Sequence, residues 1–255
     1  MAQAIPFSAP DLPSVPLGRD QGLMASLRDL NPRAELLDSR AVTMLMTTIR
    51  NKATGQRDFV NASDRLMQIL VEEGLARLPG AAPTTVTTPC GEFAGLSAPD
   101  TASICGVDIM RSGSILLEAL RKVAPDSKTA KILVQRDEAT AMPHLMYSKL
   151  PPNIADLQVV LCDPMLGTGG SALTAIDVLK KAGVREESVL LLNVLCVPEG
   201  LRALAAKAPG VTVLTASLDE RMNERFFAVP GLGDYGDRYY GTFGYEEGLW
   251  GSAQL

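Results

Sequence analysis

The chain has 255 residues, of which 46% are hydrophobic, and its formal net charge is −5, which together predict one domain with a substantial core. No more than two basic residues adjoin anywhere, so the sequence argues against a nucleic-acid-binding surface. The one long apolar run, residues 189–197, is too short to cross a membrane. No apolar leader opens the sequence, and we therefore expect a cytoplasmic protein.

The cysteines and the histidine exclude several kinds of site. Four cysteines are scattered along the chain without a C-x-x-C pair, and we expect them to be reduced core residues in a reducing compartment. His144 is the only histidine in the sequence. This argues against a histidine-rich metal site and against a Ser-His-Asp triad.

The first third of the chain is predicted to be helical. Residues 1–40 are expected to form an N-terminal arm, proline-rich and non-helical at first, with a short helix near 20–30. A single domain is then expected over residues 41–255. A stripe of apolar residues within 42–49 predicts the next helix, and Ser63 is the expected N-cap of a third helix that ends before Pro79. We expect these helices to build a homo-oligomer interface.

The rest of the chain alternates between strands and helices. Residues 84–88 and the segment around Phe93 are typical of a hairpin at a sheet edge. Five apolar strands follow, and helices lie between most of them; the strands are expected near 103–110, 131–134, 157–162, 189–197 and 211–218. This alternation predicts an α/β fold whose parallel sheet is covered by helices on both faces. The segment 141–152 is expected to be a surface connection, or alternatively a flap over the site.

Three polar side chains follow directly after predicted strands. Arg111, Arg136 and Asp163 each come just beyond the carboxyl end of a strand. In open α/β sheets, ligands bind at that edge. The sequence therefore predicts a binding site there.

The segment 157–183 predicts a strand, a glycine-rich turn and a helix. The turn at Thr168–Ser171 leaves backbone N–H groups at a helix start, where the helix dipole favours a phosphate. Asp163 cannot face that phosphate closely and is expected to take hydroxyls or a metal-bound water. An acid before a phosphate cradle suggests a sugar phosphate, although a short Gly-Thr-Gly-Gly segment is also compatible with a plain tight turn.

Two longer motifs carry a resemblance to a known family. Asp163-Pro-Met-Leu-Gly-Thr-Gly-Gly-Ser171 resembles the phosphoribosyl-pyrophosphate (PRPP) motif of uracil phosphoribosyltransferases, in which alanine usually stands at the position of Gly167. The segment Pro230-Gly-Leu-Gly-Asp-Tyr-Gly-Asp237 resembles the second signature of the same family. The resemblance runs from about residue 41 to residue 242. Phe227 and Ala228 depart from the usual residues before this second motif.

The resemblance implies a type I phosphoribosyltransferase fold, mainly parallel and flanked by helices, with a small hood at about residues 224–242. It implies the conversion of uracil and PRPP to UMP and pyrophosphate in pyrimidine salvage. The catalytic residues would be Arg111, Arg136 and Asp163. The PRPP-binding residues would be these three together with Pro164, Met165, Leu166, Gly167, Thr168, Gly169, Gly170, Ser171 and Asp234. The uracil-binding residues would be Ala228, Gly233, Asp234 and Tyr235.

The resemblance also implies partners. Mg²⁺ would be bound mainly through PRPP and water, without a dedicated protein site. A homodimer or homotetramer is expected, and GTP is a candidate effector because it activates some members of the family.

Several alternatives stay open from the sequence. Arg111 could instead pair with Asp108 or Glu118, and Arg136 with Asp137 or Glu138. The enzyme could act on another base. The chain could also be a catalytically weak regulatory protein that binds PRPP or UMP, or an oligomeric scaffold with a vestigial site.

Overall fold

The computed structural model describes residues 21–136 and 143–242, and its centre is a seven-stranded sheet in the order β1-β11-β9-β7-β4-β5-β6. All neighbouring strands run parallel except β6, which is antiparallel to β5. The strands span Ala34–Leu36 (β1), Ile104–Met110 (β4), Lys128–Arg136 (β5), Pro143–Lys149 (β6), Gln158–Cys162 (β7), Val189–Asn193 (β9) and Thr212–Thr215 (β11). The predicted α/β fold with a mainly parallel sheet is confirmed.

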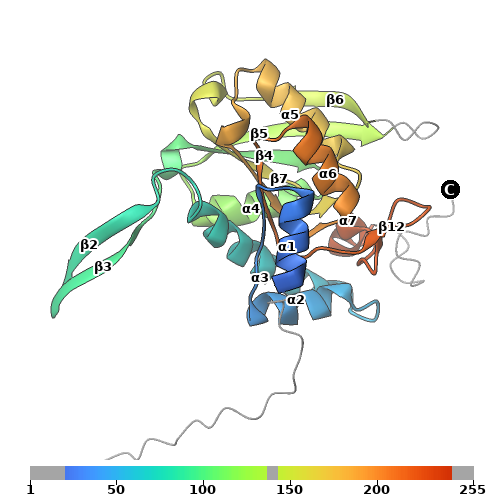
Figure 1. The fold of residues 1–255 in the computed structure, drawn as a ribbon, viewed down its shortest axis with the longest axis horizontal. Coiled ribbons are helices and arrows are strands. Elements are labelled where there is room, and N and C mark those ends of the chain that lie inside the picture. The colour runs from blue at the N-terminus through green and yellow to red at the C-terminus, as the bar shows by residue number, and fades with distance from the viewer. Residues whose placement is uncertain (1–20, 137–142, 243–255) are drawn as a thin grey trace, which may run out of the picture.

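Helices cover both faces of this sheet (Figure 1). The α-helices span Gln21–Leu30 (α1), Arg40–Arg50 (α2), Gln56–Leu75 (α3), Gly113–Val123 (α4), Gly170–Lys181 (α5), Pro198–Lys207 (α6) and Tyr235–Tyr240 (α7). Short 3-10 turns lie at Thr101–Ser103, Ile154–Asp156 and Glu186–Ser188. The buried faces of α2, α3 and α4 form one hydrophobic core, and those of α5 and α6, together with Leu27 of α1, form the other. Burial of these apolar stripes stabilises the layers.

Two predicted elements differ from the structure at their ends or edges. Ser63 does not cap α3, because the helix begins two turns earlier and Gly55 is its N-cap; Ser63 is fully buried. Residues 143–149, within the segment expected to be a surface connection or a flap, form the edge strand β6, and residues 141–142 lie outside the described residues. β1 was not predicted because it has only three residues, and it attaches residues 34–36 to the sheet by pairing with β11.

Three small two-stranded sheets accompany the central one. β8 (Met165–Leu166) pairs with β10 (Leu195–Cys196), and β12 (Arg221–Met222) pairs with β13 (Ala228–Val229). The predicted hairpin is confirmed as β2 (Ala82–Thr88) and β3 (Gly91–Ser97). It does not lie at an edge of the main sheet but projects from the domain, as Figure 1 shows.

The cysteine prediction is right for three of four residues. Cys105, Cys162 and Cys196 are buried thiols, whereas Cys90 is exposed in the hairpin turn. Over residues 21–136 and 143–242, the structure contains no helix that is both long and apolar enough to span a membrane.

Candidate active site

The glycine-rich turn after β7 ends at a helix start. α5 begins at Gly170, and its N-cap Gly169 has the left-handed φ of +81°. A helix start leaves its first N–H groups without intrahelical partners, and the helix dipole adds positive potential there. A side chain at Gly169 would also press on α6, because its Cβ would lie 3.3 Å from that of Ala203. The turn therefore presents backbone donors at a site suited to a phosphate.

Asp163 lies directly after β7 and is only 8% exposed. Its backbone oxygen accepts a hydrogen bond of 2.9 Å from Nδ2 of Asn193, and its N–H donates to Leu192 at 3.3 Å. β9 therefore fixes the backbone of Asp163 at the carboxyl edge of the sheet. That edge is where the sequence predicted the binding site.

Arg111 follows β4 and reaches the C-terminal part of the chain. Its Nη2 lies 2.7 Å from Oδ1 of Asp237 and 3.6 Å from Oδ1 of Asp234, and its Nη1 donates to Oγ1 of Thr242 at 3.0 Å. In this structure its carboxylate partners are these two aspartates rather than Asp108 or Glu118.

Asp108 has different partners. Its Oδ2 accepts hydrogen bonds from Ser114 Oγ (2.6 Å) and from Lys131 Nζ (2.8 Å), and its side chain is fully buried. This carboxylate ties the start of α4 to β5 and so supports the loop that carries Arg111.

Arg136 is the last residue of β5, and its backbone pairs with Pro143 of β6. It therefore lies at the same carboxyl edge of the sheet as Arg111 and Asp163. Its candidate partners Asp137 and Glu138 lie outside the described residues.

A cavity of about 330 Å³ lies between the two sequence motifs. From the glycine-rich turn it is lined by Met165 and Gly167, and from the loop after β4 by Ser112. The opposite wall comes from Met222 of β12 and from the hood, which contributes Phe226, Phe227, Ala228 and the residues from Gly233 to Gly236. All four residues predicted to bind uracil line this one cavity, together with two from the predicted PRPP motif.

The hood helix α7 supports this wall. Asp234 caps the helix, since its Oδ1 accepts a 2.8 Å hydrogen bond from the backbone N–H of Asp237. Burial raises the pKa of the Asp234 carboxyl above its ordinary value, and the charge of Asp237 acts in the same direction. The Tyr235 side chain packs edge-on against Phe59 at 5.3 Å and is buried, so its backbone is the part that can meet a base.

The comparisons with known proteins agree with this geometry. The family model for uracil phosphoribosyltransferase matches residues 36–242. The chain belongs to the uracil phosphoribosyltransferase family.

Relatives of this phosphoribosyltransferase cover most of its length. The uracil phosphoribosyltransferase of Dictyostelium discoideum is 46% identical over 199 residues, which cover 78% of this chain and 91% of that protein. The one from Saccharomyces cerevisiae is 46% identical over 196 residues, covering 77% and 90%. The solved structure of the AQ2163 protein from Aquifex aeolicus superposes with a TM-score of 0.71 at 29% identity, covering 83% of this chain and 100% of that one.

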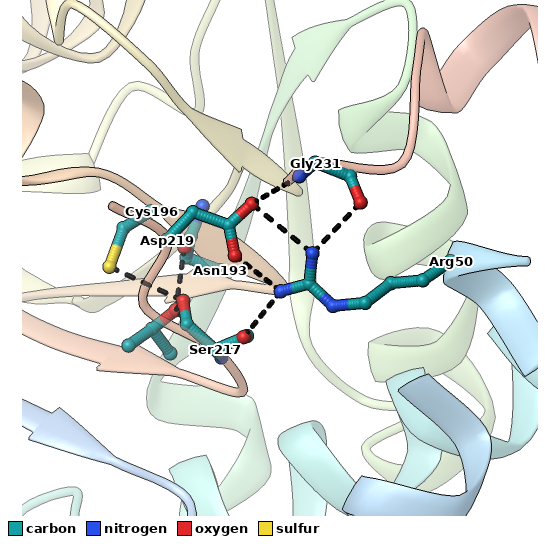
Figure 2. Close-up of polar contacts among 7 residues, drawn as sticks. Arg50, Asn193, Cys196, Ser217, Asp219 and Gly231 are labelled. Carbon is teal, nitrogen blue, oxygen red and sulfur yellow. Dashed lines mark hydrogen bonds and ion pairs between the residues drawn. The ribbon is translucent and has the colours of Figure 1, made fainter. Parts of the chain in front are cut away.

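Sequence reasoning missed two arginines that hold the hood of this phosphoribosyltransferase. Arg50, at the end of α2, binds Asp219, Ser217 and Gly231 (Figure 2). Arg238 is fully buried; it donates to the backbone oxygens of Leu232 (2.7 Å) and Asn51 (2.8 Å) and lies 4.4 Å over the ring of Phe59. Each arginine has a partner more than 160 residues away in the sequence, although Leu232 is only six residues from Arg238, and the only local signal is a charge beside an apolar stripe.

Proposed function

We propose that this pentosyltransferase converts uracil and PRPP to UMP and pyrophosphate, as its membership of the family implies, in the cavity between the glycine-rich turn and the hood. The observation that supports this most is the lining of the cavity: Met165 and Gly167 come from one motif, and Ala228, Gly233 and Asp234 from the other. A base held by the hood would there lie next to a sugar phosphate held by the turn. Such juxtaposition is the main requirement of a transfer between two substrates.

The 5′-phosphate of PRPP is assigned to Thr168, Gly169, Gly170 and Ser171. The N–H groups at the start of α5 donate to its oxygens, and the left-handed Gly169 keeps side-chain atoms out of the way. Pro164, Met165, Leu166 and Gly167 form the floor beside the ribose. Asp163 faces the ribose hydroxyls, for which a carboxylate is a good acceptor.

Arg111 and Arg136 are assigned to the pyrophosphate, with Asp234 approaching PRPP from the hood. The bond from C1′ to pyrophosphate loosens first, and positive charge develops on the ribose ring. N1 of uracil then attacks C1′, and the proton of N1 passes to the departing pyrophosphate or to water. A guanidinium keeps its charge throughout and can donate two N–H groups to phosphate oxygens. Catalysis on this scheme is mainly positioning and electrostatic stabilisation of the leaving group.

Mg²⁺ is assigned to PRPP and water rather than to a protein cage. Among residues 21–136 and 143–242, no three acidic, histidine or cysteine side chains cluster closely enough to hold a metal. Asp163 and Asp234 are the carboxylates that would contact the hydrated ion, and the ion would supply positive charge to offset that of the leaving pyrophosphate.

Uracil is assigned to the backbone of Ala228, Gly233 and Tyr235. The base presents two carbonyls and two N–H groups, which backbone donors and acceptors can match. Gly233 has a φ of +85°, a conformation that glycine adopts without strain, so the loop can bring main-chain groups close to the base.

The hairpin supports a homo-oligomer. β2 and β3 pair only with each other in the described part of the chain, and Val86, Phe93 and Leu96 are 48%, 61% and 58% exposed. An isolated two-stranded hairpin is marginally stable in water, and exposed apolar side chains mark contact sites. We assign the hairpin to the surface of a second copy of the chain, in a homodimer or homotetramer.

The three buried thiols fit a reducing compartment, and we place the enzyme in the cytoplasm.

Formation of nucleotide and pyrophosphate from PRPP tests the assignment. We expect UMP from uracil, little product from orotate, hypoxanthine or adenine, and a requirement for Mg²⁺. Asp163→Asn is expected to lower the rate strongly, because it removes the charged acceptor for the ribose. A comparable rate on a purine would overturn the base assignment, and PRPP binding without pyrophosphate release would favour the regulatory alternative.

A further inference from the structure

The ion pair between Arg50 and Asp219 binds one residue, Gly231, of the segment 228–233, whose backbone we assign to uracil and call the base-reading loop. Figure 2 shows the two side chains facing each other, with Gly231 above them. Both Nη atoms of Arg50 bind the Asp219 carboxylate, and Nη2 also donates to Ser217 Oγ at 2.7 Å. The carboxylate is almost completely buried, with 1% of the side chain exposed.

Both backbone polar groups of Gly231 are bound by this pair. Oδ2 of Asp219 accepts the Gly231 N–H at 2.7 Å, and Nη1 of Arg50 donates to the Gly231 oxygen at 2.8 Å. The ion pair thus satisfies the donor and the acceptor of one residue, as a neighbouring strand would. Only glycine fits there, because φ is +68° and a Cβ would collide with the backbone oxygen of Ala228.

Gly231 lies between two residues that line the base cavity, Ala228 and Gly233. Fixing its peptide groups therefore fixes the chain direction on both sides of it. The Arg50–Asp219 ion pair is itself connected to the predicted PRPP motif. The backbone N–H of Asp219 donates to the backbone oxygen of Cys196 at 2.9 Å, and Cys196 of β10 pairs with Leu166 of β8. The contacts form a continuous path from the predicted sugar-phosphate site to the base-reading backbone.

Charge makes this anchor strong. A charged partner strengthens a hydrogen bond, and a buried carboxylate that loses its cation is left with an uncompensated desolvation cost. Lysine cannot replace Arg50 without loss, because it lacks the planar fork that meets the carboxylate and the Gly231 oxygen together. The geometry therefore demands an arginine at the end of α2.

We propose that Arg50 and Asp219 are positioning residues for uracil: through Gly231 they set the distance of the base-reading backbone from the PRPP motif. Neither side chain touches the base. The inference rests on the proposed function, since it assigns Ala228 and Gly233 to uracil. Loss of the Arg50–Asp219 ion pair displaces the backbone groups of Ala228 and Gly233 that contact uracil. The phosphate-binding turn at the start of α5 stays in place.

Steady-state kinetics of three variants test this. Arg50→Lys keeps the charge and removes the fork, Asp219→Asn removes the charge, and Ser217→Ala removes one donor–acceptor contact of Arg50. We expect the KM for uracil to rise about tenfold or more in the first two and about two- to threefold in the third. The KM for PRPP is expected to change less than twofold in all three. Arg77→Lys is the matched control, because Arg77 also bridges two carboxylates, Glu35 and Glu73, but just beyond the C-terminal end of α3, where both carboxylates are partly exposed.

The double variant Arg50→Lys/Asp219→Asn separates positioning from general damage. Because both residues act through Gly231, the KM of the double variant for uracil is expected to be close to that of the worse single variant. It should not rise by the product of the two single-variant increases. Equal rises in the two KM values, or no change in either, would overturn the inference. If Asp219→Asn does not fold, the Arg50→Lys variant decides the question alone, by whether its KM for uracil rises while its KM for PRPP stays nearly constant. A wild-type enzyme that forms no UMP would instead count against the proposed function.

Discussion

Arg111 and Asp237 face each other at 2.7 Å, although 126 residues separate them in the chain. Asp237 is itself held, because its Oδ1 also accepts a 2.7 Å hydrogen bond from Thr242 Oγ1. The guanidinium lies against Gly236, where an added Cβ would come within 3.0 Å of Nη2. Asp237 of α7 and Thr242, which follows the helix, therefore hold the arginine that we assign to the pyrophosphate.

Asp237→Asn tests whether this contact prepares Arg111 for PRPP. A guanidinium has five N–H donors, and Asp237 and Thr242 take two of them, which leaves three for phosphate oxygens. Without the charged anchor we expect the arginine to sample other rotamers and the KM for PRPP to rise about tenfold, which corresponds to about 1.4 kcal/mol. Asp58→Asn, at an exposed pair with Arg57, is the control. A lower KM would mean that Asp237 competes with pyrophosphate for Arg111.

Gly200→Ala is expected to displace the backbone of the predicted PRPP motif, because α6 packs directly against it. Gly200 lies in α6, and a Cβ there would overlap the backbone oxygen of Gly167 and come within 3.0 Å of that of Leu166. Backbone atoms cannot rotate away, so the free energy of unfolding should fall by about 1–3 kcal/mol. Chemical denaturation measures this, and the KM for PRPP should rise as well. Gly95→Ala is the comparison, because its Cβ meets only the exposed ring of Phe93; equal effects would contradict the explanation.

The thiols predict a single reactive cysteine. Cys90 is exposed, whereas burial raises the pKa of Cys105 and of Cys196 to about 12 and that of Cys162 well above its ordinary value. Because the thiolate is the reactive form, a thiol reagent at neutral pH should label at most one cysteine, Cys90, in the native protein and four in denaturant. Cys90→Ser should leave none that reacts quickly. Two or more fast thiols in the native protein would contradict the burial.

The same thiols give the stability a pH dependence. In the unfolded chain they ionise near 9.0, and in the folded state Cys105 and Cys196 keep their protons to about 12. Between these values the folded state binds more protons than the unfolded state, so the free energy of unfolding falls as pH rises. Denaturation midpoints measured from pH 8 upward should therefore decrease, and Cys105→Ala should weaken the decrease.

The sequence predicted those parts of the molecule that depend on local pattern. Apolar runs gave the strands β4, β7 and β9, and the glycine-rich turn gave the start of α5. The prediction of a cap at Ser63 was wrong because Phe59, one turn earlier, already packs in the core. β6 was missed because its side chains are mostly exposed and no apolar run marks it.

The anchors of the hood could not be predicted, because they depend on residues brought together by the fold. Arg50 and Arg238 were ordinary charges in the sequence, and most of their partners, such as the Asp219 carboxylate and the backbone oxygens of Gly231 and Asn51, come from distant segments. Resemblance to a family assigned Ala228 and Gly233 to the base, but it did not say which contacts hold these two residues in the cavity wall. The hydrogen bonds of Gly231 with Arg50 and Asp219 are the contacts that hold this part of the wall.

Gly167→Ala tests the one departure within the PRPP motif. A Cβ at Gly167 would lie 3.1 Å from Cε and 3.3 Å from Sδ of Met222, so Met222 occupies the space next to an alanine methyl. A thioether is flexible and can shift by a few tenths of an ångström, unlike the backbone oxygens around Gly200. We therefore expect a change in the KM for uracil of less than about threefold. The unfolding free energy should stay constant or rise by about 0.4–1 kcal/mol, because the unfolded chain loses conformational freedom. Met222→Ala, which opens the same wall of the cavity, should raise the KM for uracil more than Gly167→Ala does. The reverse order would show that Gly167 itself, and not the methionine above it, shapes the base site.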